Sequence, residues 1–241
     1  MSRFLSTIIF SVLLVCATDI QAQTIVYIGD SITDGAWGRS KGTDMPSEER
    51  NHTDYNHIFG HSYMFISASK LMADYPGRYI CHNRGISGNA VSDLEGRWDK
   101  DVLSLNPDVV SILVGTNDIH RVLADGVQFD AEDWERHYCE LLDKTLRNNP
   151  NVKFVLGTPF VVKVGKIGES ENYPDRERWV NQCAEIVRKI AVKYGAKLVD
   201  YNELFKLLDQ PSLSYWSWDG IHPTPAGHHK MATIWLDVFL K

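Results

Sequence analysis

The sequence predicts a three-layer α/β/α sandwich with a mostly parallel, five-stranded sheet. Short apolar runs alternate along the chain with longer segments of helical periodicity, the order that produces parallel strands joined by helices. Most of these runs are continuously apolar rather than alternating, which is typical of strands covered on both faces. The length of 241 residues suits one domain of this kind.

Five runs are expected to form the strands: Thr24–Ile28, Tyr79–His82, Asp108–Gly115, Val152–Pro159 and Ala196–Tyr201. Five segments are expected to form the main helices: Ser62–Tyr75, Val91–Leu105, Asp130–Asn148, Asp175–Tyr194 and Pro225–Leu240. Local signals support several of their ends. Pro76 and Pro107 follow the first two helices, Asp130 can cap the third, and Gly195 is a typical residue just past the end of the fourth.

Residues 1–22 differ from the rest and resemble a secretory signal peptide, which leaves residues 23–241 as a single domain. One basic residue, Arg3, precedes an apolar stretch from Phe4 to Ala17, which is too short for a stable membrane span. Cleavage after Ala17 or Ala22 would give an exported protein, periplasmic or secreted. The alternatives are a buried first helix, an uncleaved anchor, or a lipid anchor on Cys16, whose preceding residues match a lipobox poorly.

The charge balance argues against a nucleic-acid partner. The formal net charge is −6 and the isoelectric point is near 5.8, whereas phosphate binding requires an excess of Lys and Arg. After removal of the signal peptide three cysteines remain, Cys81, Cys139 and Cys183, and none has the spacing of a structural zinc site. Small buried side chains are the favoured interpretation, and their pairing stays open.

The first strand ends in "GDS", which places Ser31 just past its carboxyl end. Ligands bind at this edge of open α/β sheets. Other predicted strand ends at the same edge are followed by "NRGISGNAV" and "GTNDIH", and "WDGIHPTPAGHH" lies just before the last helix. A serine is a nucleophile only when a base takes its proton, and Asp219 and His222 in the last loop could complete a nucleophilic triad.

These blocks resemble the SGNH hydrolases, also called the GDSL esterase/lipase family. The chain has "GDS" at Gly29–Ser31, Gly88 in "GISGN", Asn117 in "GTND", and "DGIH" at Asp219–His222, all in family order. The third residue after the glycine is Ile32 instead of the usual leucine, a conservative change. The resemblance implies the flavodoxin-like α/β/α fold already expected, over residues 23–241.

The resemblance also implies a role for each marker residue. Ser31 would be the nucleophile, His222 the general base and then acid, and Asp219 the carboxylate that orients the imidazole. The oxyanion hole would consist of the backbone N–H groups of Ser31 and Gly88 and the side-chain amide of Asn117. No metal or organic cofactor is implied.

Each marker also has an ordinary structural explanation. Ser31 could be a helix N-cap, while Asn117 and Asp219 could be turn residues. That all of them coincide at one sheet edge in family order favours catalysis. Asp30 and Asp118 are interpreted as structural residues of the loops beside the site. A metal site is disfavoured because the only obvious candidates have irregular spacing in a polar loop: Asp44, His52, Asp54, His57 and His61.

The substrate is less well defined by the sequence. The candidate substrate contacts are aromatic: Trp37, Tyr215, Trp216 and Trp218. The loops near the site are mainly polar, which favours a short-chain ester, an O-acetyl group on carbohydrate, over a long acyl chain. A lysophospholipase or thioesterase activity and a non-catalytic glycan-binding protein are the alternatives. The sequence leaves the natural substrate and the oligomeric state open.

Overall fold

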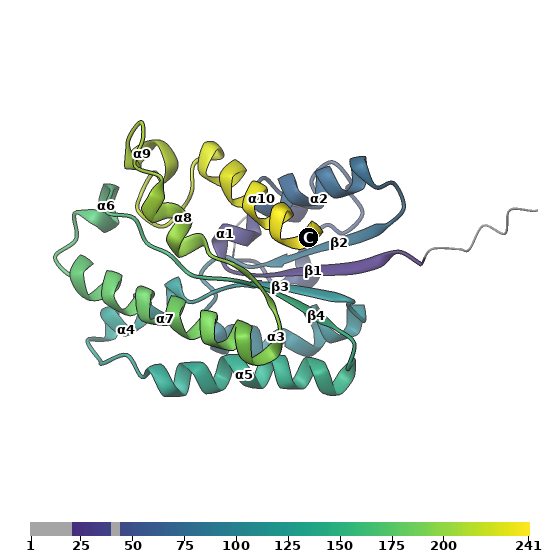
Figure 1. Cartoon of the computed structure of the whole chain (residues 1–241), viewed down its shortest axis with the longest axis horizontal. Coiled ribbons are helices and arrows are strands. Elements are labelled where there is room, and N and C mark those ends of the chain that lie inside the picture. Colours follow the sequence, from purple (N-terminus) through teal and green to yellow (C-terminus); the bar gives the residue numbers. More distant parts are fainter. Residues whose placement is uncertain (1–20, 40–43) are drawn as a thin grey trace, which may run out of the picture.

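The computed structural model describes residues 21–39 and 44–241, and the core of the protein is a five-stranded sheet (Figure 1). The strands lie in the order β2-β1-β3-β4-β5, and every neighbouring pair is parallel. Their bounds are Gln23–Gly29 (β1), Tyr79–Gly85 (β2), Val109–Leu113 (β3), Lys153–Gly157 (β4) and Lys197–Val199 (β5). The structure confirms the predicted parallel sheet.

Helices cover both faces of this sheet and complete the predicted three layers (Figure 1). One layer contains α2 (Tyr63–Asp74), α8 (Tyr201–Leu207) and α10 (Pro225–Leu240); the other contains α3 (Val91–Asp101), α5 (Ala131–Asn148) and α7 (Tyr173–Tyr194). The shorter helices are α1 (Ser31–Asp34), α4 (Thr116–Asp125), α6 (Gly165–Gly168), α9 (Leu213–Trp216), and the 3₁₀ turns η1 (Trp37–Arg39), η2 (Ser47–Glu49) and η3 (Leu103–Leu105).

The structure confirms the helix ends that were predicted from capping residues at 130 and 195. Asp130 caps α5 by accepting the N–H of Asp133 at 2.9 Å, and Gly195 ends α7 with a φ of 60°. Strand bounds differ from the predicted ranges by up to three residues, and two helices differ more clearly. The helix expected over 91–105 stops at Asp101 and continues as η3, and α4 begins at Thr116, where the sequence suggested a loop. The N-cap residue of α4 is Gly115, which has no side chain to cap the helix, so the sequence carries no capping signal at this position.

A hydrophobic core fills each interface between sheet and helices, and one large indole on each side of the sheet has its N–H hydrogen-bonded. Trp98 lies in the layer of α3, α5 and α7 and donates to the Thr145 hydroxyl at 2.9 Å. Trp235 of α10 lies in the opposite layer and donates to the Ser111 hydroxyl at 2.9 Å. Each tryptophan therefore adds a large apolar area without leaving a buried donor unpaired.

The cysteines at 81, 139 and 183 are free and buried, as the sequence analysis favours. Burial raises the pKa of the Cys81 thiol to about 12 and raises that of Cys183 well above its ordinary value. The signal-peptide prediction concerns mainly residues 1–20, including Cys16, and these lie outside the described residues. None of the helices in the described ranges has the length and apolar character needed to cross a membrane.

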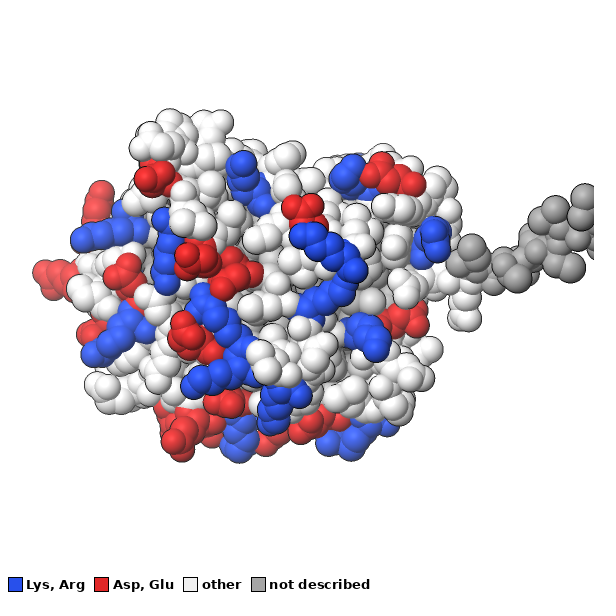
Figure 2. Space-filling model, viewed as in Figure 1, with Lys and Arg blue, Asp and Glu red and all other residues white. Residues whose placement is uncertain are grey.

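Figure 2 shows Lys and Arg interspersed with Asp and Glu over the visible face, so this face has no large patch of one sign. A different arrangement exists inside the molecule. Asp34 at the end of α1 and Arg50, just after η2, form a two-pronged ion pair with N–O distances of 2.6 and 3.0 Å. Both side chains are 0% exposed. The ion pair joins α1, which follows β1, to the segment at residues 44–50.

We expect Arg50→Met to destabilise the protein by about 3–5 kcal/mol, because it leaves the Asp34 carboxylate buried without its guanidinium. Urea unfolding followed by circular dichroism measures this change. Lys70→Met is the matched control, since Lys70 and Asp74 form an exposed pair whose loss should barely move the unfolding midpoint. Equal midpoint shifts in the two variants would contradict the importance assigned to the buried pair.

Candidate active site

The site begins where β1 ends, at a point of close backbone packing. A Cβ on Gly29 would lie 2.1 Å from the carbonyl oxygen of Leu113 in β3, so only glycine fits. Asp30 then caps α1 by accepting the N–H of Ile32 at 3.0 Å. The N-cap is therefore Asp30, and Ser31 is the first residue of α1 with its side chain at the carboxyl edge of the sheet.

Ser31, His222 and Asp219 form a continuous hydrogen-bonded chain. The Asp219 carboxylate lies 2.7 Å from Nδ1 of His222, and Nε2 of the same ring lies 2.8 Å from the Ser31 hydroxyl oxygen. Because the carboxylate accepts, Nδ1 carries the proton and Nε2 is free to accept from the serine. Asp219 also accepts the backbone N–H of His222 at 2.7 Å, which fixes the carboxylate itself.

The electrostatics of this chain favour a basic imidazole. The hydrogen bond to Asp219 raises the pKa of His222, and the negative charges of Asp219 and Asp30 add to that effect against desolvation. Burial raises the pKa of Asp219, but the hydrogen bonds from His222 and the backbone N–H groups lower it overall. An imidazole oriented in this way can take the proton of a serine hydroxyl as the serine attacks a carbonyl carbon.

The residues expected to bind an oxyanion are held at the same edge. Gly88 has a φ of +78°, and a Cβ built on it would meet no atom within 4 Å, so its backbone faces open space. Asn117 is the second residue of α4, which corrects its expected place on a loop. Its amide donates to the Asn89 carbonyl at 3.1 Å and lies 3.4 Å from an oxygen of Asp30. These contacts bring the three loops together.

Two further carboxylates accept backbone N–H groups from neighbouring segments and so hold these loops together. Asp118 accepts the N–H of Val91 at 3.0 Å and so ties α4 to the start of α3, as the sequence analysis expected for this residue. Asp34 accepts the N–H of Ser87 at 2.8 Å and ties α1 to the loop that carries Gly88. Burial raises the pKa of the neighbouring Asp30 to about 7.

An open cleft of about 570 Å³ surrounds the Ser31 hydroxyl and the His222 ring. Its lining consists of Ser31, Gly35, Ala36, His61, Ser87, Trp218, His222, Pro223, Pro225 and His228. The sequence analysis did not predict that His61 and His228 line the cleft; it considered His61 only as a disfavoured metal ligand. His228 lies three residues into α10 and carries no motif of its own, so only the packing of α10 against α2 could reveal it.

The aromatic candidates differ in their positions. Trp218 is 66% exposed, and its ring stacks on His222 with centroids 6.3 Å apart at 27°. Tyr215 is also exposed. Trp216 is half-buried and donates its indole N–H to the Gln210 carbonyl at 2.8 Å. Of this group, Trp218 alone lines the cleft.

Trp37 does not fit its predicted role as a substrate contact. Its ring is 0% exposed, and the indole N–H donates to the Gly85 carbonyl at 2.9 Å. The guanidiniums of Arg50 and Arg84 lie 4.8 and 5.2 Å from the ring centroid. Trp37 therefore packs against two arginines, because its aromatic face suits their partly desolvated charges.

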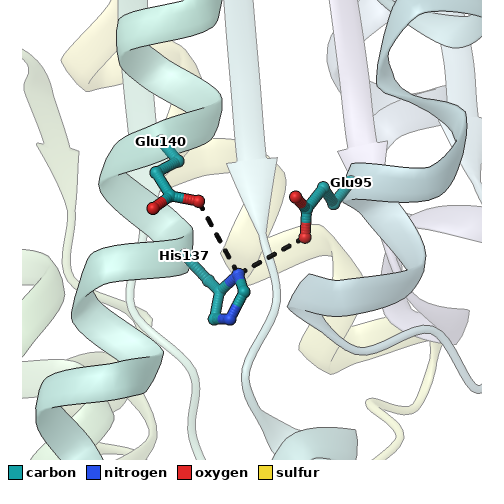
Figure 3. A group of neighbouring side chains, drawn as sticks. All are labelled: Glu95, His137 and Glu140. Atoms are coloured by element: carbon teal, nitrogen blue, oxygen red, sulfur yellow. Dashed lines mark ion pairs between the residues drawn. The ribbon is translucent and has the colours of Figure 1, made fainter.

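One cluster in the described ranges has the composition of a metal site, and it is not the one considered from the sequence. Glu95 of α3 lies beside His137 and Glu140 of α5, with donor atoms within 4.8 Å of one another (Figure 3). Arg136 donates to Glu140 at 2.7 Å, so an arginine already compensates part of this charge. Residues from Asp44 to His61 form no such group among the described residues; His57 there faces the Asp54 carboxylate at 3.1 Å.

Comparison with known proteins gives a consistent result. Residues 27–230 match the GDSL-like lipase/acylhydrolase family. The chain is 33% identical over 227 residues to the acetylxylan esterase of Geobacillus stearothermophilus, a match that covers 89% of this chain and 92% of that protein.

Solved structures extend the comparison. A GDSL-like protein of Parabacteroides merdae superposes with a TM-score of 0.77 at 30% identity, covering 92% of this chain and 99% of that one. The acetylxylan esterase Axe2 of G. stearothermophilus superposes with a TM-score of 0.69 at 29% identity, covering 92% and 94%. Two further Axe2 structures are of catalytic mutants, one with a serine and one with a histidine replaced by alanine.

The site geometry predicts that His222 titrates above the ordinary histidine value of 6.5. Asp219→Asn should lower this pKa, because it removes the negative charge that stabilises the imidazolium. Ring-proton NMR across a pH series measures both values. His228, whose pKa is lowered to about 4 by burial, serves as an internal reference in the same spectra. A His222 pKa that does not change in the Asp219→Asn variant would contradict the assigned hydrogen bond.

Proposed function

The chain belongs to the GDSL-like lipase/acylhydrolase family and is a carboxylic-ester hydrolase, and from that premise we propose that it is an exported serine esterase that removes short acyl groups, chiefly acetyl, from carbohydrate. One observation carries the catalytic part of this proposal: the unbroken chain from the Ser31 hydroxyl through His222 to Asp219.

The first half-reaction transfers the acyl group to Ser31. His222 Nε2 takes the hydroxyl proton while Oγ attacks the ester carbonyl carbon, which gives a tetrahedral intermediate. The intermediate collapses as the C–O bond to the alcohol breaks, and His222 passes the proton to the leaving oxygen. Asp219 holds the ring in the required tautomer and stabilises the imidazolium. A water then repeats these steps on the acyl-enzyme and releases the acid.

Fixed dipoles would stabilise the negative oxygen of the intermediate. The backbone N–H groups of Ser31 and Gly88 and the amide of Asn117 are the proposed donors. Asn117 is held through its contact with the Asn89 carbonyl, which leaves its second amide hydrogen for the oxyanion, because the competing distance to Asp30 is long at 3.4 Å.

Three features favour an acetylated carbohydrate as the substrate. The relative with 33% identity is an acetylxylan esterase. Gly35, Ala36 and the prolines line a cleft that is open to solvent rather than a deep, enclosed tunnel. Trp218 presents an exposed indole beside His222, and indoles stack on the C–H faces of sugar rings. The proposal that the protein is exported rests on residues 1–22 of the sequence alone.

Ser31→Ala should lower kcat for ester hydrolysis by about 10⁶-fold, and His222→Ala should be comparably damaging because the nucleophile and the base act as a unit. Turnover of p-nitrophenyl acetate measures the loss, and thermal unfolding confirms that the variants are folded. Ser87→Ala is the matched control: it removes a hydroxyl from the same cleft and keeps the backbone N–H that Asp34 accepts, so most turnover should remain. Near wild-type activity of Ser31→Ala would refute the nucleophile assignment.

Asn117→Ala should reduce kcat by about 10²–10³-fold and leave KM almost unchanged, because the amide acts on the transition state and not on bound substrate. Steady-state kinetics on the same ester separate the two constants. A higher KM at constant kcat would instead place Asn117 in ground-state binding.

The acyl preference should be highest for acetyl, should fall by butyrate, and should leave little turnover of octanoate. A lipase-type pocket gains about 0.8 kcal/mol for each CH₂ that it buries, so its kcat/KM rises with chain length. A series of p-nitrophenyl esters measures this dependence. A rise out to octanoate would favour the lysophospholipase or thioesterase activity and would leave the assignments of Ser31, His222 and Asp219 unaffected.

A further inference from the structure

A second histidine, His228, lines the cleft, and a hydrogen bond fixes its tautomer. His228 lies in the first turn of α10 and lines the same cleft as Ser31 and His222. Its Nδ1 accepts the backbone N–H of Tyr63, the first residue of α2, at 3.1 Å. A ring nitrogen that accepts an N–H carries no proton, so in the neutral ring the proton is on Nε2.

The surroundings of His228 keep the ring neutral. Burial, together with the nearby His61 and His222, lowers the pKa of His228 to about 4. No carboxylate of the described residues lies within ion-pair distance of the ring. The Nε2–H group is therefore a neutral donor. The hydrogen bond between Nδ1 and the Tyr63 N–H fixes the orientation of the ring. No protein acceptor within the described ranges bonds to Nε2–H.

His228 and the proposed oxyanion donors come from opposite layers of the fold. The proposed oxyanion donors are Gly88, in the loop before α3, and Asn117, in the first turn of α4, and both helices lie in the layer drawn below the sheet in Figure 1. His222 precedes α10 and His228 lies in its first turn, in the opposite layer. In a tetrahedral intermediate the carbonyl oxygen faces the oxyanion donors, while the leaving oxygen faces the general acid.

We propose that His228 is a specificity-determining residue that donates its Nε2–H to a hydroxyl or ring oxygen of the carbohydrate leaving group. This inference rests on the proposed function and names one contact within it. A neutral donor suits an uncharged sugar oxygen, because a cation in the same place would repel the imidazolium that forms on His222 during the reaction. Trp218 lines the same cleft and offers an apolar face to the same sugar.

A purely structural role for His228 is the competing explanation, since its Nδ1 satisfies one of the unpaired N–H groups at the start of α2. The two halves of the ring can be tested separately. Asn places its side-chain oxygen near the position of Nδ1 and has no donor near Nε2. Gln places an amide N–H near the position of Nε2 and removes the acceptor close to the backbone of residue 228.

The experiment compares His228→Asn, His228→Gln and the control His229→Asn, which makes the same change at the exposed neighbouring residue. For each variant kcat/KM is measured on p-nitrophenyl acetate, whose leaving group has no sugar hydroxyls, and on acetylated xylo-oligosaccharides. His228→Asn should lose about tenfold on the sugar ester alone, the size of effect expected for one hydrogen bond. His228→Gln should restore most of that loss, and His229→Asn should match the wild type on both esters.

The outcomes separate this assignment from the proposed function. Equal losses on the two esters, or a loss that follows the unfolding temperature and is not restored by Gln, would overturn the binding role in favour of the structural one. If the ratio of kcat/KM on the sugar ester to kcat/KM on p-nitrophenyl acetate is unchanged in His228→Asn, the binding role is also overturned. If the wild-type protein hydrolyses p-nitrophenyl acetate but no acetylated sugar, the carbohydrate part of the proposed function fails, and the His228 assignment fails with it.

Discussion

The buried ion pair between Asp34 and Arg50 is the contact on which the geometry around Ser31 depends most. Asp34 ends the single turn that carries Ser31, and its carboxylate binds Arg50 and the N–H of Ser87 together. One side chain thus joins the end of β1, the segment at 44–50 and the loop that presents Gly88. Since a carboxylate inside a protein is costly unless its oxygens are satisfied, each of these partners is needed for the others to stay in place.

The base and acid of the proposed mechanism depend on a separate local structure. The backbone of Asp219 to His222 folds back on itself: Ser217 and Pro223 form an antiparallel bridge, and Gly220 has a φ of +101°. The Asp219 carboxylate then receives two backbone N–H groups and the imidazole of the same short turn. The nucleophile is therefore positioned by the sheet and the base by its own turn, and the Ser31–His222 hydrogen bond joins the two.

The sequence predicts those parts of the protein that are encoded locally or by a family motif. The parallel sheet, the caps at Asp130 and Gly195, and the residues brought to one edge follow from short patterns and their order. The structure adds what depends on contacts between distant segments. Trp37 was expected to touch substrate, but it is buried and packs against two arginines from other segments. The start of α4 has no side-chain cap, and the Glu95–His137 contact and the environment of His228 arise from helix packing, which leaves no trace in a single segment.

The three free thiols have a consequence for what holds the fold together. Disulfide exchange requires a thiolate, and the raised pKa values of Cys81 and Cys183 keep these two groups protonated in the folded protein. With Cys81, Cys139 and Cys183 each enclosed by the core, the described domain owes none of its cohesion to oxidation. The fold of the described residues is therefore stabilised by packing and hydrogen bonds, and these three side chains contribute to it as small buried groups.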